Sequence, residues 1–257
     1  MTKILVVSDV HNKPEIFKKA LEVADKESCD KVLLMGDYLD DFGDTPETTF
    51  NTIMALRETL EDPRVIALIG NHELSYLEDQ RCSGWTAAKK FLVDEYVERS
   101  KLTLSYQESN WLFTHAGLTE RWWKYANRLN ITPGNKQDPT YIQQEAGETY
   151  SSWLNRYWER YPGIYKSIGE ERGGFGIGSP LWADWHELTH HNIPGINQVV
   201  GHTPSNVIEE KEHNGDRLIC VDVWSNDGPG GFLLWEDGKT TMLDSTGSSV
   251  VQAASGA

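Results

Sequence analysis

The sequence is poor in cysteine and has no long apolar run. Cys29, Cys82 and Cys220 are far apart and odd in number, and no Cys-x-x-Cys pair occurs. We therefore expect a reduced, intracellular protein without a disulfide framework. The apolar run at residues 4–7 is too short for a signal-peptide core or a membrane span, so we also expect a cytoplasmic chain that binds no membrane.

Basic residues are scarce as well. The 257 residues include 24 lysines and arginines against 39 aspartates and glutamates, which gives a formal net charge of -15 at pH 7. An acidic surface repels nucleic-acid phosphates, so we expect no non-specific binding of DNA or RNA. A small phosphorylated substrate is still compatible with this charge, because bound metal cations can reverse the local field.

The order of apolar and amphipathic segments predicts an α/β protein. Short apolar runs indicate buried strands, and a helical pattern follows each of the first three. This alternation favours a sheet with helical crossovers. The expected strands cover residues 3–8, 31–35, 65–69, 102–106, 111–114 and 198–200, with helices from Pro14, at 46–60 and at 86–99, and hairpin strands within 217–243 around the turn Asp237-Gly238.

We expect one domain over residues 1–244. Residues 119–195 hold much of the tryptophan and alternate amphipathic patches with glycine and proline stops, which indicates a helical insertion within that domain. Residues 245–257 are small and polar, so a disordered tail is expected there. The aromatic side chains of the insertion either pack its helices, which their helical spacing favours, or form a platform for stacking nucleobases.

Polar side chains follow the first three strands at the points where these strands end. Asp9, Asp37 and Asn71 each come after an apolar strand, and we expect their turns to meet beyond the strand C-termini. Glycines precede Asp37, Asn71 and His202, and we expect them to permit sharp turns that aim the next side chain inward. The candidate site is made of Asp9-Val10-His11, Gly36-Asp37-Tyr38-Leu39-Asp40, Gly70-Asn71-His72-Glu73, His115 and Gly201-His202.

The side chains of this set are those of a metal site. Imidazole and carboxylate without sulfur suit zinc, iron or manganese, whereas oxygen ligands alone would indicate calcium or magnesium. A two-metal site needs a bridging ligand such as a carboxylate, and water between the metals can ionise and attack phosphorus. His72 is the candidate acid for the leaving oxygen, because its neighbour Asn71 would bind a metal, and Asp40 would orient that imidazole.

The ordered set closely resembles the calcineurin-like metallophosphoesterases. Its motifs are Asp-x-His, Gly-Asp-x-x-Asp, Gly-Asn-His-Glu, His-Ala-Gly and Gly-His-Thr, and they look most like the phosphoprotein-phosphatase branch, which includes bacterial and phage enzymes. Leu181-Trp182-Ala183-Asp184 is similar to a Leu-Trp-Ser-Asp segment of that branch. Many other relatives carry Gly-His-x-His, and this sequence, with Thr203 and Pro204 after His202, lacks that last histidine.

The resemblance implies a two-sheet β-sandwich flanked by helices (αββα) and a binuclear metal-dependent phosphoester hydrolase. Metal-bound hydroxide would attack phosphorus, and the two divalent ions would be manganese, with iron or zinc as alternatives. The substrate would be a phosphomonoester, either a phosphoprotein or a nucleotide. A dinucleoside-polyphosphate hydrolase or a phosphodiesterase is the alternative. The implied roles are Asp9 and His11 on the first metal, Asp37 as the bridge, Asn71, His115 and His202 on the second metal, and His72 with Asp40 as the acid pair.

One departure from the branch concerns the substrate. Its phosphatases read Gly-Asp-x-x-Asp-Arg-Gly, but Asp41 replaces the arginine that would bind the phosphate, and no arginine lies between Asp184 and His202. A carboxylate that points inward would repel phosphate, which argues against protein-phosphatase activity and favours a different phosphoester. The candidates to replace the missing arginine are Arg81, Arg121 and Arg172.

The sequence leaves two alternatives to a phosphoester hydrolase, a zinc protease and a non-catalytic scaffold. His186-Glu187-Leu188-Thr189-His190 matches the zinc-protease pattern His-Glu-x-x-His, but a persuasive third ligand is missing and Pro194-Gly195 ends the helix soon afterwards. A solvated helix is the favoured interpretation of that segment. A non-catalytic scaffold of the same fold would be expected to lose metal ligands or the acid, and this sequence retains both.

Overall fold

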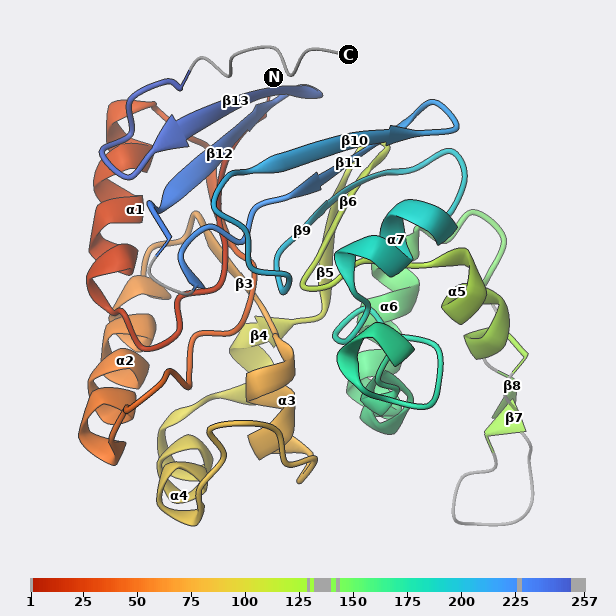
Figure 1. Ribbon diagram of the computed structural model, residues 1–257, viewed down its shortest axis with the longest axis horizontal. Coiled ribbons are helices and arrows are strands. Elements are labelled where there is room, and N and C mark those ends of the chain that lie inside the picture. The colour runs from red at the N-terminus through yellow and green to blue at the C-terminus, as the bar shows by residue number, and fades with distance from the viewer. Residues whose placement is uncertain (1, 129, 132–139, 142–143, 226–227, 251–257) are drawn as a thin grey trace.

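Two β-sheets face each other, and helices cover both outer sides (Figure 1). The predicted αββα sandwich is therefore confirmed. No helix in the described part of the chain is both long and apolar enough to cross a membrane. This computed structural model describes residues 2–128, 130–131, 140–141, 144–225 and 228–250.

The first sheet has six strands in the order β13-β12-β1-β2-β3-β4. β1 to β4 run parallel, and β12 lies antiparallel between β1 and β13. The predicted turn Asp237-Gly238 is confirmed between β12 and β13, with φ values of 46° and 85°. Positive φ at both residues is what a type I′ hairpin requires. The strands are β1 (Lys3–Val7), β2 (Lys31–Leu34), β3 (Val65–Leu68), β4 (Leu102–Thr103), β12 (Gly231–Glu236) and β13 (Lys239–Asp244).

The second sheet has five strands in the order β10-β11-β9-β6-β5. β9 lies at its centre and pairs in parallel with both β6 and β11. A hairpin joins β10 to β11 through Asn214-Gly215, a turn that the sequence analysis did not identify. The strands are β5 (Ser105–Glu108), β6 (Trp111–Thr114), β9 (Asn197–Val200), β10 (Glu209–His213) and β11 (Asp216–Cys220).

The prediction of one strand over residues 102–106 is wrong, because the chain changes sheets in its middle. β4 belongs to the first sheet and β5 to the second, with buried Leu104 between them. The Asn155 side chain holds this crossing, since its Oδ1 accepts the N–H groups of Leu104 and Ser105 at 2.9 and 3.0 Å. β5 and β6 form a hairpin in which Glu108 pairs with Trp111, as the sequence around Glu108-Ser109-Asn110 indicates.

The helices form two groups on opposite sides of the sandwich (Figure 1). α1 packs on β1 and β2, whereas α6 packs on β5 and α7 on β10. Pro46 begins α2 after a Thr45 cap, and Thr86 caps α4 in the same way. The helices are α1 (Glu15–Lys26), α2 (Pro46–Thr59), α3 (Asn71–Leu77), α4 (Ala87–Tyr96), α5 (Glu120–Ala126), α6 (Tyr150–Arg160) and α7 (Trp185–His191), with 3-10 turns at Arg99–Lys101, Pro162–Lys166 and Glu170–Arg172 and short strands β7 (Asn130–Ile131) and β8 (Thr140–Tyr141).

The aromatic residues of the predicted insertion form a packed cluster. Trp122 and Trp153 are fully buried and meet edge to face, with ring centroids 6.2 Å apart, and Tyr165 stacks on Trp122 at 5.4 Å. These buried rings have no free face for a nucleobase, so they pack the helices instead. After β13 the chain turns back and Ser249 pairs with Leu243, whereas residues 251–257 of the predicted tail lie outside the described residues.

We predict that Trp153→Ala lowers the free energy of unfolding by about 3–5 kcal/mol, because it leaves a large cavity among the other rings. Urea denaturation followed by circular dichroism measures this change. Tyr125→Ala is the matched control, since Tyr125 is 47% exposed and its removal should change stability by less than about 0.5 kcal/mol. Equal effects of the two substitutions would contradict the packing account.

Candidate metal centre

Strands from both sheets end at one edge of the sandwich, and the six predicted ligands lie beyond them. Asp9, Asp37 and Asn71 follow β1, β2 and β3 of the first sheet. His115 and His202 follow β6 and β9 of the second. Because the carboxyl ends of these strands meet, side chains that are far apart in sequence come together between the two sheets.

The structure contains two groups of donor atoms with one member in common. Asp9, His11 and Asp37 form the first group, and Asp37, His115 and His202 form the second, with donor atoms within 4.8 Å of one another in each. Asp37 therefore lies between them. Asn71 joins the second group, because its Oδ1 lies 3.0 Å from His115 Nε2.

The ring nitrogens of this site are oriented by backbone carbonyls. His115 Nδ1 lies 2.9 Å from the Met35 carbonyl oxygen, and His11 Nδ1 lies 2.7 Å from the Asp40 carbonyl oxygen. When Nδ1 donates to a carbonyl, Nε2 keeps its lone pair for a metal. His115 Nε2 lies 3.1 Å from His202 Nδ1 and 3.4 Å from Asp37 Oδ2, so several lone pairs point into one small space.

Several buried polar atoms in this region have no hydrogen-bond partner among the described residues, and Oδ2 of Asp222 is one of them. Unpaired buried polar atoms are costly, so such atoms beside a cluster of imidazoles and carboxylates fit a site completed by cations. The donor set contains nitrogen and oxygen only, which suits manganese, iron or zinc.

Burial and neighbouring charges shift the pKa values of the site residues in different directions. Although burial alone would raise it, the pKa of Asp37 is held well below its usual range by His115 and His72. Burial opposes protonation of His115, but Asp37 raises the pKa of that imidazole to about 9. Burial, followed by the nearby charge of Asp222, raises the pKa of Asp9 well above its ordinary value. The carboxylates thus repel one another unless positive charge lies between them.

The backbone at the site adopts an uncommon conformation. Four non-glycine site residues have positive φ angles: 44° at His11, 50° at Asp37, 66° at Asp40 and 67° at His202. Each such residue costs on the order of 1 kcal/mol, and clusters of them occur where function fixes the geometry. Gly36 also has a positive φ, of 97°, as the sharp-turn prediction requires.

The prediction that Gly70 and Gly201 permit sharp turns is wrong. Gly70 has an ordinary φ of -103°, and a Cβ on it would lie 2.1 Å from Asp37 Oδ1. A Cβ on Gly201, which also lacks a positive φ, would lie 2.2 Å from Asp9 Oδ2. Glycine is required because a carboxylate lies against the backbone. This approach lets the His202 N–H donate to Asp9 at 3.0 Å and the His72 N–H donate to Asp37 at 2.9 Å.

His72 and Asp40, the predicted acid pair, are in direct contact. His72 Nδ1 lies 2.9 Å from Asp40 Oδ2, and His72 Nε2 lies 4.0 Å from Asp37 Oδ2 on the side of the metal groups. The other carboxylate oxygen of Asp40 accepts the Tyr76 hydroxyl at 2.6 Å and Lys89 Nζ at 2.8 Å. Burial would raise the pKa of Asp40, but His72, Lys89 and Tyr76 lower it.

Three residues of this site have no role in the sequence analysis. The buried carboxylate of Glu73 accepts the N–H groups of Gly70, Asp37, Tyr38 and Leu39, which joins two of the motif loops. Asp222 follows the apolar strand β11, which is the same signal that marks Asp9 after β1. Lys89 is fully buried in α4 and also binds Asp44 at 2.6 Å, and no sequence pattern indicates this contact.

Asp41 lies beside the positively charged side chain of Lys13. Its carboxylate is 3.6 Å from Lys13 Nζ, and both Asp41 and Phe42 line a pocket of about 150 Å³ that His11, Asp40 and His72 also line. The carboxylate is thus at the rim of the site, with its charge partly offset by Lys13.

Of the three candidate arginines, Arg172 lies beside a predicted metal ligand, His202. Its Nη2 donates to the His202 carbonyl at 2.9 Å and to Thr203 Oγ1 at 2.6 Å. Its Nε pairs with Asp184 at 3.0 Å, and Asp184 also caps α7. Arg81 instead lies over the Trp85 ring, and Arg121 lines a pocket with His186 and His190.

The zinc-protease pattern is not arranged as a metal site. His186 and His190 are exposed on α7, and neither belongs to any of the three metal-ligand groups found among the described residues. Glu187 turns inward, where Oε1 accepts the Gly178 N–H at 3.1 Å. A general base would need a metal beside it, and no metal-ligand group of the described residues lies at Glu187, so this segment is a surface helix.

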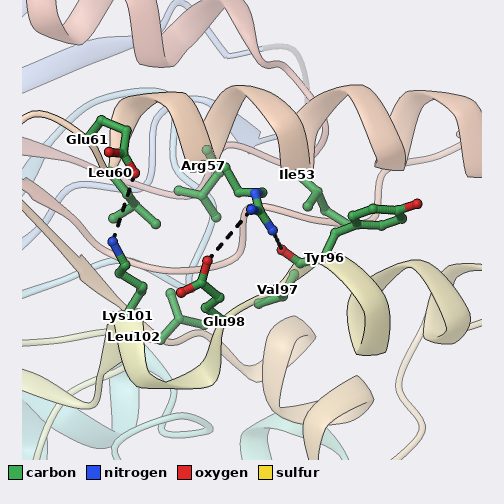
Figure 2. A pocket seen from close by; sticks show the side chains of 10 residues that line it. Ile53, Arg57, Leu60, Glu61, Tyr96, Val97, Glu98, Lys101 and Leu102 are labelled. Atoms are coloured by element: carbon green, nitrogen blue, oxygen red, sulfur yellow. Dashed lines mark hydrogen bonds and ion pairs between the residues drawn. The ribbon is translucent and has the colours of Figure 1, made fainter.

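Another cavity lies between α2 and the segment that follows α4 (Figure 2). Its charged side chains are paired with one another: Arg57 with Glu98 at 3.7 Å and Lys101 with Glu61 at 4.0 Å. Its space of about 40 Å³ is far below the roughly 300–1,000 Å³ of a small-molecule site. This cavity is therefore too small to be a small-molecule site.

We predict that Gly201→Ala weakens Mn²⁺ binding by about 10- to 100-fold, because the new Cβ displaces the Asp9 carboxylate. Isothermal titration calorimetry with the metal-free protein measures the affinity. Gly163→Ala is the control, since a Cβ there meets nothing within 4 Å. Unchanged affinity in Gly201→Ala would remove Asp9 from the metal site.

Comparisons with known proteins agree with this geometry. The family described as calcineurin-like phosphoesterase matches residues 2–225. No curated protein sequence matches the chain. The structure is similar to a point mutant of a cold-active protein tyrosine phosphatase (TM-score 0.62, 17% identity, 97% of this chain and 80% of that chain covered). The protein-tyrosine phosphatase of a psychrophilic Shewanella species gives a TM-score of 0.59 at 18% identity, with the same coverage.

A protein serine/threonine phosphatase from Saccharomyces cerevisiae is similar as well (TM-score 0.51, 12% identity, 99% of this chain and 82% of that chain covered). At these identities the solved structures show a shared fold. The family match, by contrast, covers most of the chain and includes the strand ends that carry Asp9, Asp37, Asn71, His115 and His202. The chain therefore belongs to the calcineurin-like phosphoesterase family, whose members use divalent metals to hydrolyse phosphoester bonds.

Proposed function

We propose that this chain is a binuclear metal-dependent phosphomonoesterase. The observation that carries the proposal is the position of Asp37, which belongs to both groups of donor atoms. Asp9 and His11 would hold one divalent ion with Asp37, and Asn71, His115 and His202 would hold the other. A pair of divalent ions lowers the pKa of a water molecule and neutralises charge on phosphoryl oxygens.

His72 and Asp40 supply the acid in this proposal. His72 Nε2 faces the metal groups, so a proton on that atom can pass to the leaving oxygen of a phosphoester. Asp40 binds Nδ1 and keeps the imidazole in the orientation that places Nε2 there. Lys89 and Tyr76 fix Asp40 through its second oxygen, so the carboxylate does not rotate away.

The rim of the pocket favours a phosphomonoester as the substrate, either a phosphoprotein or a nucleotide. Asp41 adds negative charge to the rim, and Phe42, 98% exposed, adds an apolar surface. A polyphosphate carries more negative charge than a monoester and is repelled more strongly by Asp41. Hydrolysis of dinucleoside polyphosphates is therefore the second candidate, and a phosphodiesterase stays a further alternative, because a diester carries less negative charge than a monoester and Asp41 does not disfavour it. Arg172, a candidate for the missing arginine, instead supports the His202 loop in this proposal. Its Nη2 donates to the His202 carbonyl and to Thr203 Oγ1, and its Nε pairs with Asp184.

The test of this function is hydrolysis of para-nitrophenyl phosphate with manganese. We expect activity with Mn²⁺ that EDTA abolishes, and we expect His72→Ala to lower kcat by about 100-fold or more while both metals are retained. Metal content is measured by inductively coupled plasma mass spectrometry. His186→Ala is the control because that histidine is exposed on α7. A fully active His72→Ala enzyme would show that the acid is another group.

Asp41→Arg tests the role of the rim charge. We expect it to lower KM for para-nitrophenyl phosphate by about three- to tenfold, because a repulsive charge becomes attractive, with Asp41→Asn giving an intermediate value. Steady-state kinetics at low and at high salt measure the effect, and high salt should reduce the difference. An unchanged KM in both variants would show that Asp41 does not act on the substrate.

A further inference from the structure

The loop between α3 and α4 brings a cysteine to the acid pair. Cys82 Sγ lies 3.7 Å from His72 Nδ1, the nitrogen that contacts Asp40 Oδ2 at 2.9 Å. The donor atoms of Asp40, His72 and Cys82 all lie within 4.8 Å of one another. This third group contains sulfur, unlike the two that share Asp37. The spacing of positions 40, 72 and 82 matches no metal-binding motif.

The separation of the sulfur and the nitrogen suits a tetrahedral cation. Zinc bonds are about 2.3 Å to thiolate and about 2.0 Å to imidazole, which places the two ligand atoms of a tetrahedral site about 3.5 Å apart. The observed separation of Sγ and Nδ1, 3.7 Å, is close to this value. Thiolate is a soft ligand that selects zinc and cadmium over manganese and magnesium, whereas the six-residue centre offers nitrogen and oxygen only.

The site is held in place before any ion binds. Oδ1 of Asp40 is occupied by Lys89 and Tyr76, which leaves Oδ2 facing His72. The loop is fixed as well, because Gly84 lies against Asp40 and its carbonyl accepts Lys89 Nζ at 2.9 Å. Outer contacts of this kind orient the groups that bind a metal and raise its affinity.

The local charge also favours a divalent cation. Lys89 is paired with both Asp40 and Asp44, so these three side chains carry a net charge of minus one. The thiolate of Cys82 adds a second negative charge, and a divalent ion balances both. Cys82 is half-buried, while Cys29 and Cys220 are buried elsewhere in the fold.

We propose that Cys82, His72 and Asp40 form a separate inhibitory site for a thiophilic divalent cation such as Zn²⁺. The ion replaces the proton between His72 Nδ1 and Asp40 Oδ2, and binding releases that proton together with the thiol proton of Cys82. His72 Nδ1 is then bound to the ion, so Asp40 no longer orients the imidazole or stabilises its protonated form. The inhibitory consequence rests on the acid role proposed above, whereas the site itself does not.

Cadmium absorption tests the site without any measurement of activity. Titration of the metal-free full-length protein with Cd²⁺ should produce an ultraviolet thiolate-to-cadmium charge-transfer band. The band should be absent in Cys82→Ser and present in the control Cys29→Ser, and His72→Ala should weaken cadmium affinity by about tenfold or more. The six-residue centre has no sulfur, so it contributes no such band. No band in the wild-type protein, or an equal band in Cys82→Ser, would overturn the site.

Inhibition is tested separately with the manganese-loaded enzyme. Zn²⁺ should inhibit the wild type, and Cys82→Ser should need about tenfold more zinc for half-inhibition, with each rate expressed relative to the same variant in manganese alone. Exchange of zinc into the six-residue centre affects both proteins equally and so cancels. Equal inhibition of both would overturn the regulatory role. A wild type without activity in manganese would contradict the proposed function, while the cadmium band would still decide whether the site exists.

Discussion

The negative charge of Asp37 lies in the interior, between strand ends of the two sheets, and much of the site's construction follows from holding it there. A buried carboxylate is destabilising unless donors and positive charge surround it. Asp37 receives the His72 amide and lies beside the His115 imidazole, yet Asp9 and Asp222 add further buried negative charge. The site is therefore built to be completed by cations.

This constraint explains features that otherwise look unrelated. Carboxylates that approach the backbone exclude any side chain at Gly70 and Gly201. Glu73 binds the amides of both loops, so the Asp37 turn and the start of α3 keep a constant separation. Strained backbone at several site residues is tolerated because these contacts over-determine it. The same region supports Asp40, so the proposed acid pair and the metal groups share one network of contacts.

The strand–helix alternation predicts an α/β sheet, and the two-sheet sandwich is what the resemblance of the motifs implies. The six proposed ligands could be predicted because they follow apolar strands, and parallel strands place such residues at one edge. Asp222 follows the same rule and was overlooked. Lys89, Tyr76 and Cys82 could not be predicted, since they reach Asp40 and His72 from a helix and a loop whose paths depend on tertiary packing. The crossing at Leu104 was missed for a similar reason, because a sheet change leaves no interruption in an apolar run.

Anomalous diffraction from manganese-loaded crystals of the chain tests the central claim most directly. The account predicts two peaks about 3.5–4 Å apart, both within bonding distance of Asp37. One peak should lie beside Asp9 and His11, and the other beside Asn71, His115 and His202. A single peak, or a pair of which only one contacts Asp37, would contradict the account.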